Sequence, residues 1–301
     1  MINRESFRLN TPNGWPIQGD VRWLADREPG PDSRLILVLV HGFKGFKDWG
    51  HFPFVAGRLA ETGVPVVSFN LSGSGIGEHP EKFTELDRFR ENTLTREVAD
   101  LDLVLEALKA DQLPGTLAGH RRFILLGHSR GAIATTVIAG RRPDIVGLVN
   151  WAGVGVLRDR YPEEVRRDWR ANGELPVVNG RTGQLMPIGL QALDDLESHL
   201  DDYSPRHLAS ALVVPHLLIH GDADSSVPAA ESEAVAAASG GRTRLVVLPG
   251  ADHTFGSIHP FAGEGPHLTR ALALTREFIE MIRGTAGPET GAGREIPCSG
   301  K

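Results

Sequence analysis

The 301-residue chain contains a single cysteine, Cys298, which cannot form a disulfide bond within the chain. The fold therefore does not depend on an oxidising compartment. Apolar runs are short, and none approaches the roughly 20 residues that a helix needs to cross a bilayer. The first residues, Met1 to Phe7, also lack the apolar stretch of a signal peptide. These absences lead us to expect a soluble, cytoplasmic protein without a membrane partner.

An excess of positive charge is missing as well. The formal net charge is −6 at pH 7, and local arginine pairs such as Arg121 and Arg122 do not merge into a basic stripe. We therefore expect no nucleic-acid partner. The sequence also lacks the spacings of common metal sites, such as H-E-x-x-H and paired C-x-x-C. We predict neither a catalytic metal nor an organic cofactor.

Glycine, by contrast, is abundant, and residues 70–78 are rich in it. The Gly-x-Gly in this segment is followed neither by the Lys-Ser/Thr of a phosphate-binding loop nor directly by a helix. We expect a flexible loop near a pocket rather than a nucleotide site.

Apolar runs that fit buried strands alternate along the chain with segments of helical periodicity. This alternation predicts βαβ units and an α/β fold with a doubly wound, mostly parallel sheet of eight strands. After an antiparallel hairpin within 5–25, the expected strands are 35–40, 64–69, 122–126, 145–151, 216–220 and 244–248. The expected helices are 52–62, 91–110, 132–139, 228–239 and about 266–283.

Residues 152–210 interrupt this alternation. The segment is polar, contains four prolines and shows no strong pattern of a buried strand. We interpret it as a cap inserted over the carboxyl edge of the sheet, where open α/β sheets bind ligands. Residues 1–151 and 211–284 would then form the core, and the Gly/Pro-rich residues 285–301 a disordered tail.

The segment Gly127-His128-Ser129-Arg130-Gly131 lies between the apolar run 122–126 and the helical run 132–139. A strand, G-x-S-x-G and a helix in this order predict a tight turn that projects the serine hydroxyl above the sheet. The N-terminus of the following helix offers free N–H groups and a partial positive charge to an oxyanion. Ser129 is therefore a candidate nucleophile.

A serine hydroxyl is a weak nucleophile at neutral pH, so it needs a base and a third group that orients this base. Asp222 and Asp224 follow the strand expected at 216–220, and His253 follows the strand expected at 244–248. This chain order indicates His253 as the base and one of the two aspartates as the acid. We interpret Asp252 as structural, because neighbouring side chains in an extended loop point apart.

With these motifs the sequence resembles the α/β-hydrolase superfamily, in particular its bacterial dienelactone-hydrolase-like and serine-aminopeptidase-like branches. The matching features are His41-Gly42-Phe43, the G-x-S-x-G segment, Gly221-x-x-Asp224-x-x-Val227-Pro228 and Asp252-His253-Thr254-Phe255. The resemblance implies an α/β-hydrolase fold with a nucleophile elbow. It places the acid at Asp224, three residues after the loop glycine, with Asp222 as a turn-former. It also implies an oxyanion hole made by the N–H groups of Phe43 and Arg130.

We therefore hypothesise a carboxylesterase-like serine hydrolase with the catalytic residues Ser129, Asp224 and His253. Its partner would be a small-molecule ester with a small or medium acyl group. A peptidase, a thioesterase and a C–C hydrolase can use the same triad, and a non-catalytic binding protein is a further alternative. The oligomeric state, monomer or homodimer, stays open. So do substrate contacts from Arg158, Arg160, Trp169, Arg170, residues 181–184 and His259.

Overall fold

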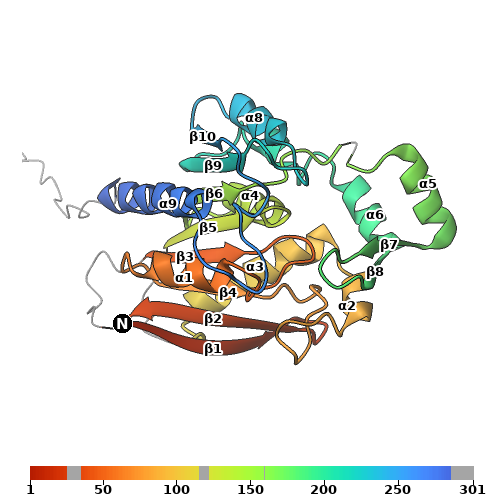
Figure 1. The fold of residues 1–301 in the computed structure, drawn as a ribbon, viewed down its shortest axis with the longest axis horizontal. Helices are drawn as coiled ribbons and strands as arrows, with labels where there is room; N and C mark the ends of the chain where they lie inside the picture. Colours follow the sequence, from red (N-terminus) through yellow and green to blue (C-terminus); the bar gives the residue numbers. More distant parts are fainter. Residues whose placement is uncertain (26–34, 115–121, 159, 286–301) are drawn as a thin grey trace, which may run out of the picture.

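A mixed sheet forms the centre of the molecule in the computed structural model, which describes residues 1–25, 35–114, 122–158 and 160–285 (Figure 1). Among these residues the sheet has eight strands in the order β1–β2–β4–β3–β5–β6–β9–β10. β1 (Ile2–Asn10) and β2 (Pro16–Leu24) form an antiparallel hairpin, and β2 also pairs antiparallel with β4 (Val66–Phe69). The remaining pairings are parallel and join β3 (Leu35–Val40), β4, β5 (Arg122–His128), β6 (Ile145–Trp151), β9 (His216–Gly221) and β10 (Thr243–Leu248). This topology confirms the predicted fold class.

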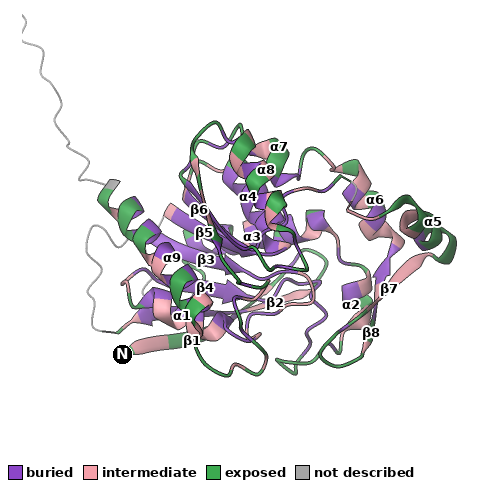
Figure 2. Ribbon diagram, turned by 45° about the horizontal axis from the view of Figure 1, so that its top comes forward, coloured by how far each residue is buried: buried purple, intermediate pink, exposed green. Residues whose placement is uncertain are grey.

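Helices cover both faces of the sheet. One face packs against α1 (Phe52–Ala60) and α9 (Pro266–Thr285), and the other against α3 (Leu94–Lys109), α4 (Gly131–Arg141) and α8 (Ala229–Ala238). In β3, Leu37 and Leu39 face α1 and α9, whereas Val38 and Val40 face α3 and α4. Because successive side chains of a strand point to opposite faces, a strand buried on both sides is apolar throughout. Figure 2 shows the buried central strands and the exposed outer surface of α9.

Residues 152–210, here named the insertion, connect β6 to β9. The insertion contains α5 (Glu163–Asn172), β7 (Glu174–Val178), β8 (Leu185–Gly189), α6 (Leu190–Ser198) and α7 (Pro205–Leu208). Figure 1 shows α5, α6, β7 and β8 grouped at one end of the molecule, beside α2 (Leu86–Arg90). Their apolar side chains share a separate small core with Phe46, Phe83 and Phe89. This group therefore packs on the loops between β3 and α3, whereas α7 packs against the core helices α4 and α8.

The antiparallel pair β7–β8 departs from the expectation that the insertion holds no strong buried strand, since Met186 and Ile188 of β8 are buried. Pro176 and Pro187 lie opposite each other in this pair. Proline in a sequence disfavours the prediction of a strand. Both strands of a two-stranded ribbon are edge strands, however, and an edge strand tolerates the missing N–H.

The glycine-rich loop also differs from the flexible segment near a pocket that the sequence led us to expect. Residues 70–77 are buried throughout. The Leu71 N–H donates to Nε2 of His41 (3.1 Å), and the Ser72 N–H donates to Oδ2 of Asp100 (2.7 Å). Glycine and serine are small enough to pack closely, so they occur in tightly held loops as well as in mobile ones. This loop is fixed against α3.

Two further expectations concern the C-terminal tail and membrane-spanning helices. The predicted disordered tail, including Cys298, lies outside the described residues except for Thr285. No helix within the described ranges combines the length and the apolar character that a bilayer span requires.

Candidate active site

Ser129 lies on the turn between β5 and α4. Its φ of 55° falls in the left-handed region, which costs a non-glycine residue on the order of 1 kcal/mol. Backbone hydrogen bonds hold this conformation: the Ser129 N–H donates to the Trp151 carbonyl (2.9 Å), and the Ser129 carbonyl accepts from the Val154 N–H (3.0 Å). A Cβ at Gly131 would lie 2.5 Å from the Val40 carbonyl oxygen. The helix can therefore begin this close to β3 only with glycine at this position.

A continuous chain of hydrogen bonds joins Ser129, His253 and Asp224. The Ser129 Oγ–H donates to Nε2 of His253 over 3.0 Å, and the His253 Nδ1–H donates to Oδ2 of Asp224 over 2.7 Å. These two bonds require the neutral imidazole with its proton on Nδ1. The Asp224 side chain is fully buried, and the His253 side chain is one-fifth exposed. The structure thus brings together three side chains from the loops after β5, β9 and β10.

Four donors surround the Asp224 carboxylate. Its Oδ1 accepts from the N–H groups of Ser226 (2.8 Å) and Val227 (2.9 Å), and Nε2 of His220 lies 3.2 Å from Oδ2, which His253 also contacts. Burial alone would raise the pKa of Asp224, but the hydrogen bonds from His220, His253 and Val227 outweigh it and hold this pKa well below its usual range. Asp224 is therefore ionised at neutral pH.

The other two aspartates nearby have structural contacts. Asp222 Oδ1 accepts from the Gly250 N–H (2.6 Å). Asp252 Oδ1 accepts from the N–H groups of Thr254 (3.0 Å) and Gly256 (2.7 Å). Each carboxylate thus ties backbone in the loop that carries His253, and the hydrogen bond to the His253 ring comes from Asp224.

The loop after β3 lies directly against Ser129. A Cβ at Gly42 would be 2.7 Å from the Ser129 Cβ and 2.9 Å from the His128 carbonyl oxygen, so glycine is required for this approach. Within the described residues, neither the Phe43 N–H nor the Arg130 N–H has a hydrogen-bond acceptor. Both amides are thus unpaired near the Ser129 hydroxyl.

His128 packs against His253. Its Nε2–H donates to the His253 carbonyl over 3.0 Å, and the two ring centroids are 5.0 Å apart. Burial lowers the pKa of His128 well below its ordinary value, so the ring stays neutral. His128 is buried under the turn and does not line the cavity.

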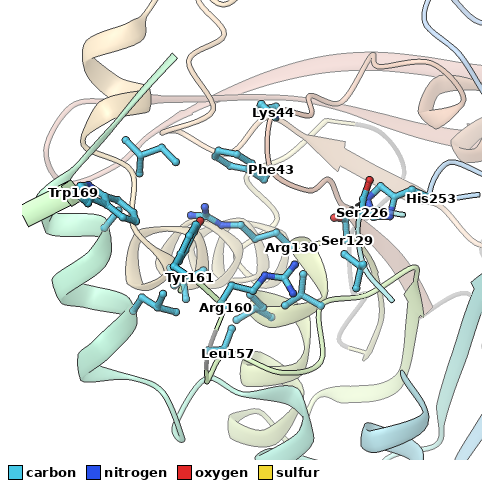
Figure 3. A pocket seen from close by; sticks show the side chains of 17 residues that line it. Phe43, Lys44, Ser129, Arg130, Leu157, Arg160, Tyr161, Trp169, Ser226 and His253 are labelled. Carbon is cyan, nitrogen blue, oxygen red and sulfur yellow. Dashed lines mark hydrogen bonds between the residues drawn. The ribbon is translucent and has the colours of Figure 1, made fainter. Parts of the chain in front are cut away.

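A cavity of about 320 Å³ opens beside Ser129 between the core and the insertion (Figure 3). The core contributes Phe43, Ser129 and His253, and the insertion contributes Tyr161 and Trp169. Further apolar lining comes from Leu94, Ile133, Val154, Leu157, Ile188, Ala192, Leu196 and Val227. Figure 3 shows Phe43, Tyr161 and Trp169 around the space to one side of Ser129 and His253. The cavity therefore offers aromatic and aliphatic walls next to the hydroxyl.

Cationic side chains also line this cavity. Arg130 Nη2 lies 2.9 Å from Oε1 of Glu97 on α3, and the Arg130 guanidinium lies over the Phe43 ring at 5.2 Å. Arg160 Nη1 contacts Glu231 Oε1 at 2.6 Å. Lys44 Nζ donates to the Val178 carbonyl of β7 over 3.0 Å, which links the insertion to the loop after β3. Among the described residues, no carboxylate lines the cavity itself.

The structure divides the remaining candidates. Trp169 and Arg160 line the cavity, whereas Arg158 lines a neighbouring surface groove. Arg181 and Gln184 instead bond backbone carbonyls of residues 81–83. His259, also outside the lining, accepts the Gly50 N–H on Nδ1 (2.9 Å). Arg181, Gln184 and His259 therefore hold loops in place rather than facing the cavity.

Sequence reasoning missed Glu97 as the partner of Arg130. Glu97 is buried on α3 at the spacing of the core-facing residues Leu94 and Leu101. An acidic residue at core spacing in an amphipathic helix is the signal from which a buried partner could have been predicted.

Comparisons with known proteins fit this architecture. The sequence model of the alpha/beta hydrolase family matches residues 37–263. Est1E from Butyrivibrio proteoclasticus has a similar structure, with a TM-score of 0.67 at 17% identity over 93% of this chain and 99% of that one. The dienelactone hydrolase from Anabaena variabilis aligns with a TM-score of 0.60 at 17% identity over 93% of this chain and 98% of that one.

A puromycin-hydrolysing peptidase from Mycobacterium tuberculosis aligns with a TM-score of 0.63 at 17% identity, over 94% of this chain and 39% of that one. No curated protein sequence matches the chain. At these identities the similar structures show a shared fold. Because the family match extends from β3 to the loop after His253, the chain belongs to the alpha/beta hydrolase family.

Proposed function

We propose that the protein is a serine hydrolase that cleaves carboxylic esters with a small or medium acyl group. The observation that carries this proposal is the unbroken hydrogen-bond chain from Ser129 through His253 to Asp224, next to a cavity that can hold a substrate. Ser129, His253 and Asp224 would act as nucleophile, general base and orienting acid.

In the first half of the reaction, Ser129 Oγ attacks the ester carbonyl carbon while His253 Nε2 takes the hydroxyl proton. The C–O bond to the alcohol then breaks, and His253 returns the proton to the leaving oxygen. In the second half, water attacks the acyl-enzyme, His253 moves the proton of this water to Ser129 Oγ, and the carboxylic acid leaves. Asp224 stabilises the imidazolium in both halves.

The N–H groups of Phe43 and Arg130 would bind the oxyanion that develops on the carbonyl oxygen. Two preorganised donors are the usual requirement for this step, and each contributes about 2.7–4 kcal/mol when measured by removal. Their unpaired state and the contact of Gly42 with Ser129 support this role.

The cavity supports an ester substrate with an apolar or aromatic acyl group. Its volume of about 320 Å³ and its aromatic walls suit a group of modest size. Ferulic acid, an aromatic acid, is bound by Est1E, which shares the fold. We propose action on a small molecule in the cytoplasm, without a nucleic-acid or membrane partner.

The same three residues, Ser129, His253 and Asp224, can also support cleavage of an amide, a thioester or a C–C bond. The peptidase among the similar structures keeps the amide alternative open. Turnover on matched ester and amide substrates separates these reactions. The further alternative, a hydrolase fold used for binding alone, requires a serine that does not react.

Substitution of the nucleophile tests the proposal. We expect Ser129→Ala to lower turnover of p-nitrophenyl esters by on the order of 10⁴- to 10⁶-fold and to abolish labelling by a fluorophosphonate probe. Ser239→Ala is a matched control, because it removes another buried hydroxyl, which donates to the Ala236 carbonyl and has no bond to Ser129, His253 or Asp224 among the described residues. An active, labelled Ser129→Ala protein refutes the mechanism.

A further inference from the structure

His220 lies on β9, four residues before Asp224, and is fully buried. Its Nε2 lies 3.2 Å from Asp224 Oδ2 and 2.9 Å from the Val227 carbonyl oxygen. Because both neighbours are acceptors, Nε2 carries the proton and donates. Nδ1 must then accept a hydrogen bond, and the hydroxyl of Ser232 on α8 lies 2.7 Å from it. The contacts on both sides of the ring thus select one neutral tautomer.

This ring extends the hydrogen-bond chain beyond Asp224. Asp224 Oδ2, which accepts from His220, is also the atom that accepts from His253 Nδ1 over 2.7 Å. The order of the bonds is therefore Ser232, His220, Asp224, His253 and Ser129. We propose that His220 is a positioning residue: its Nε2–H holds Asp224 Oδ2 against His253, and the Ser232 hydroxyl donates to Nδ1 on the other side of the ring. The inference rests on the proposed function of the same site.

The titratable groups that contact Asp224 and His253 are mainly other histidines. Asp224 faces His220 and His253, and His253 faces Asp224, Ser129 and the ring of His128. His51 lies behind His128 at 5.9 Å. Burial lowers the pKa of His51 to about 3 and that of His128 well below its ordinary value, so both rings are neutral at neutral pH. A change in the acid limb of the pH profile therefore reports the coupling between Asp224 and His253.

His220→Leu removes the donor and leaves an apolar side chain of similar size. We expect kcat to fall about tenfold with KM unchanged, since the substrate does not contact His220. The acid limb of kcat/KM should move to higher pH, because a carboxylate with one donor fewer holds the protonated imidazole more strongly. The rate of fluorophosphonate labelling should fall in parallel, which measures activation of Ser129 without any ester.

Two further variants separate positioning from packing. His220→Gln keeps an N–H donor that can reach Asp224, and we expect it to recover kcat to within about threefold of the wild type. Ser232→Ala leaves Nδ1 of the buried His220 ring without a hydrogen-bond donor and should lower kcat by about threefold. In the His220→Leu background, Ser232→Ala should have no further effect on kcat. Ser239→Ala, at the C-cap of the same helix, should leave all parameters unchanged.

The possible outcomes distinguish the two proposals. A wild-type protein that neither cleaves esters nor reacts with the fluorophosphonate refutes the proposed function, and the role of His220 with it. An active wild type whose His220→Leu variant keeps kcat and the acid limb refutes the positioning role alone. Equal losses in the Leu and Gln variants with an unmoved acid limb assign His220 to packing, which also overturns the inference.

Discussion

Asp222 and Asp224 are two residues apart in one loop, yet their surroundings differ sharply. Asp224 is buried beside two histidines, whereas Asp222 is exposed and bonds a backbone N–H of the next loop. The sequence motif alone left both as candidates. Orientation within the loop decides between them, because Asp224 Oδ1 is held by the N–H groups of Ser226 and Val227 while Oδ2 faces His253.

This difference gives a prediction for the two amide variants. Asp224→Asn should lower kcat by on the order of 10⁴-fold, because the amide no longer stabilises the imidazolium and favours the wrong tautomer. Asp222→Asn should stay within about threefold, since an amide oxygen can still accept from the Gly250 N–H. Ester turnover by both purified variants checks this, and equal losses contradict the assignment of Asp224.

At the scale of elements, the core and the insertion differed in how well their sequence predicted them. β3 is apolar throughout and β5 is apolar from Phe123 to Leu126, and burial on both faces leaves this mark in the sequence. The elbow was predictable because a short motif sits between such a strand and a helix. The β7–β8 ribbon was not, because its stability comes from packing on Phe83 and Phe89, residues distant in sequence.

On helix α5 of the insertion, Trp169 is buried, whereas the other residues are exposed or half-buried. Trp169→Ala should enlarge the cavity and raise KM roughly tenfold for esters whose acyl group reaches this wall, while kcat for acetyl esters is maintained. Trp15→Ala provides the control, because Trp15 lies in the turn of the β1–β2 hairpin and stacks on Arg96. Kinetics across a graded acyl series make the comparison; a uniform fall in kcat contradicts it.

At the scale of the whole molecule, several imidazoles are buried in the neutral form. Burial lowers the pKa of His41 to about 4 and the pKa values of His51 and His216 to about 3. In the unfolded chain these groups titrate near pH 6.5. Below that pH the unfolded state binds protons that the folded state does not, so the free energy of unfolding falls as the pH falls from 6.5 toward 3.

Removal of one such group should reduce this acid sensitivity. Between pH 6 and pH 4.5, His216→Gln should lower the slope of the free energy of unfolding against pH by about 1.4 kcal/mol per unit, the contribution of one proton. His207 is exposed, so His207→Gln should leave the slope unchanged. Denaturant unfolding at a series of pH values measures both, and an unaltered slope for His216→Gln refutes the prediction.

The crowding of donors around one carboxylate limits how protons can move in this molecule. A carboxylate has about four lone-pair positions, and in Asp224 these meet two backbone amides and two imidazole rings. A hydrogen added to either oxygen would displace one of these donors. Asp224 is thus a fixed anion, so in the proposed mechanism a proton that leaves Ser129 would travel no further than His253.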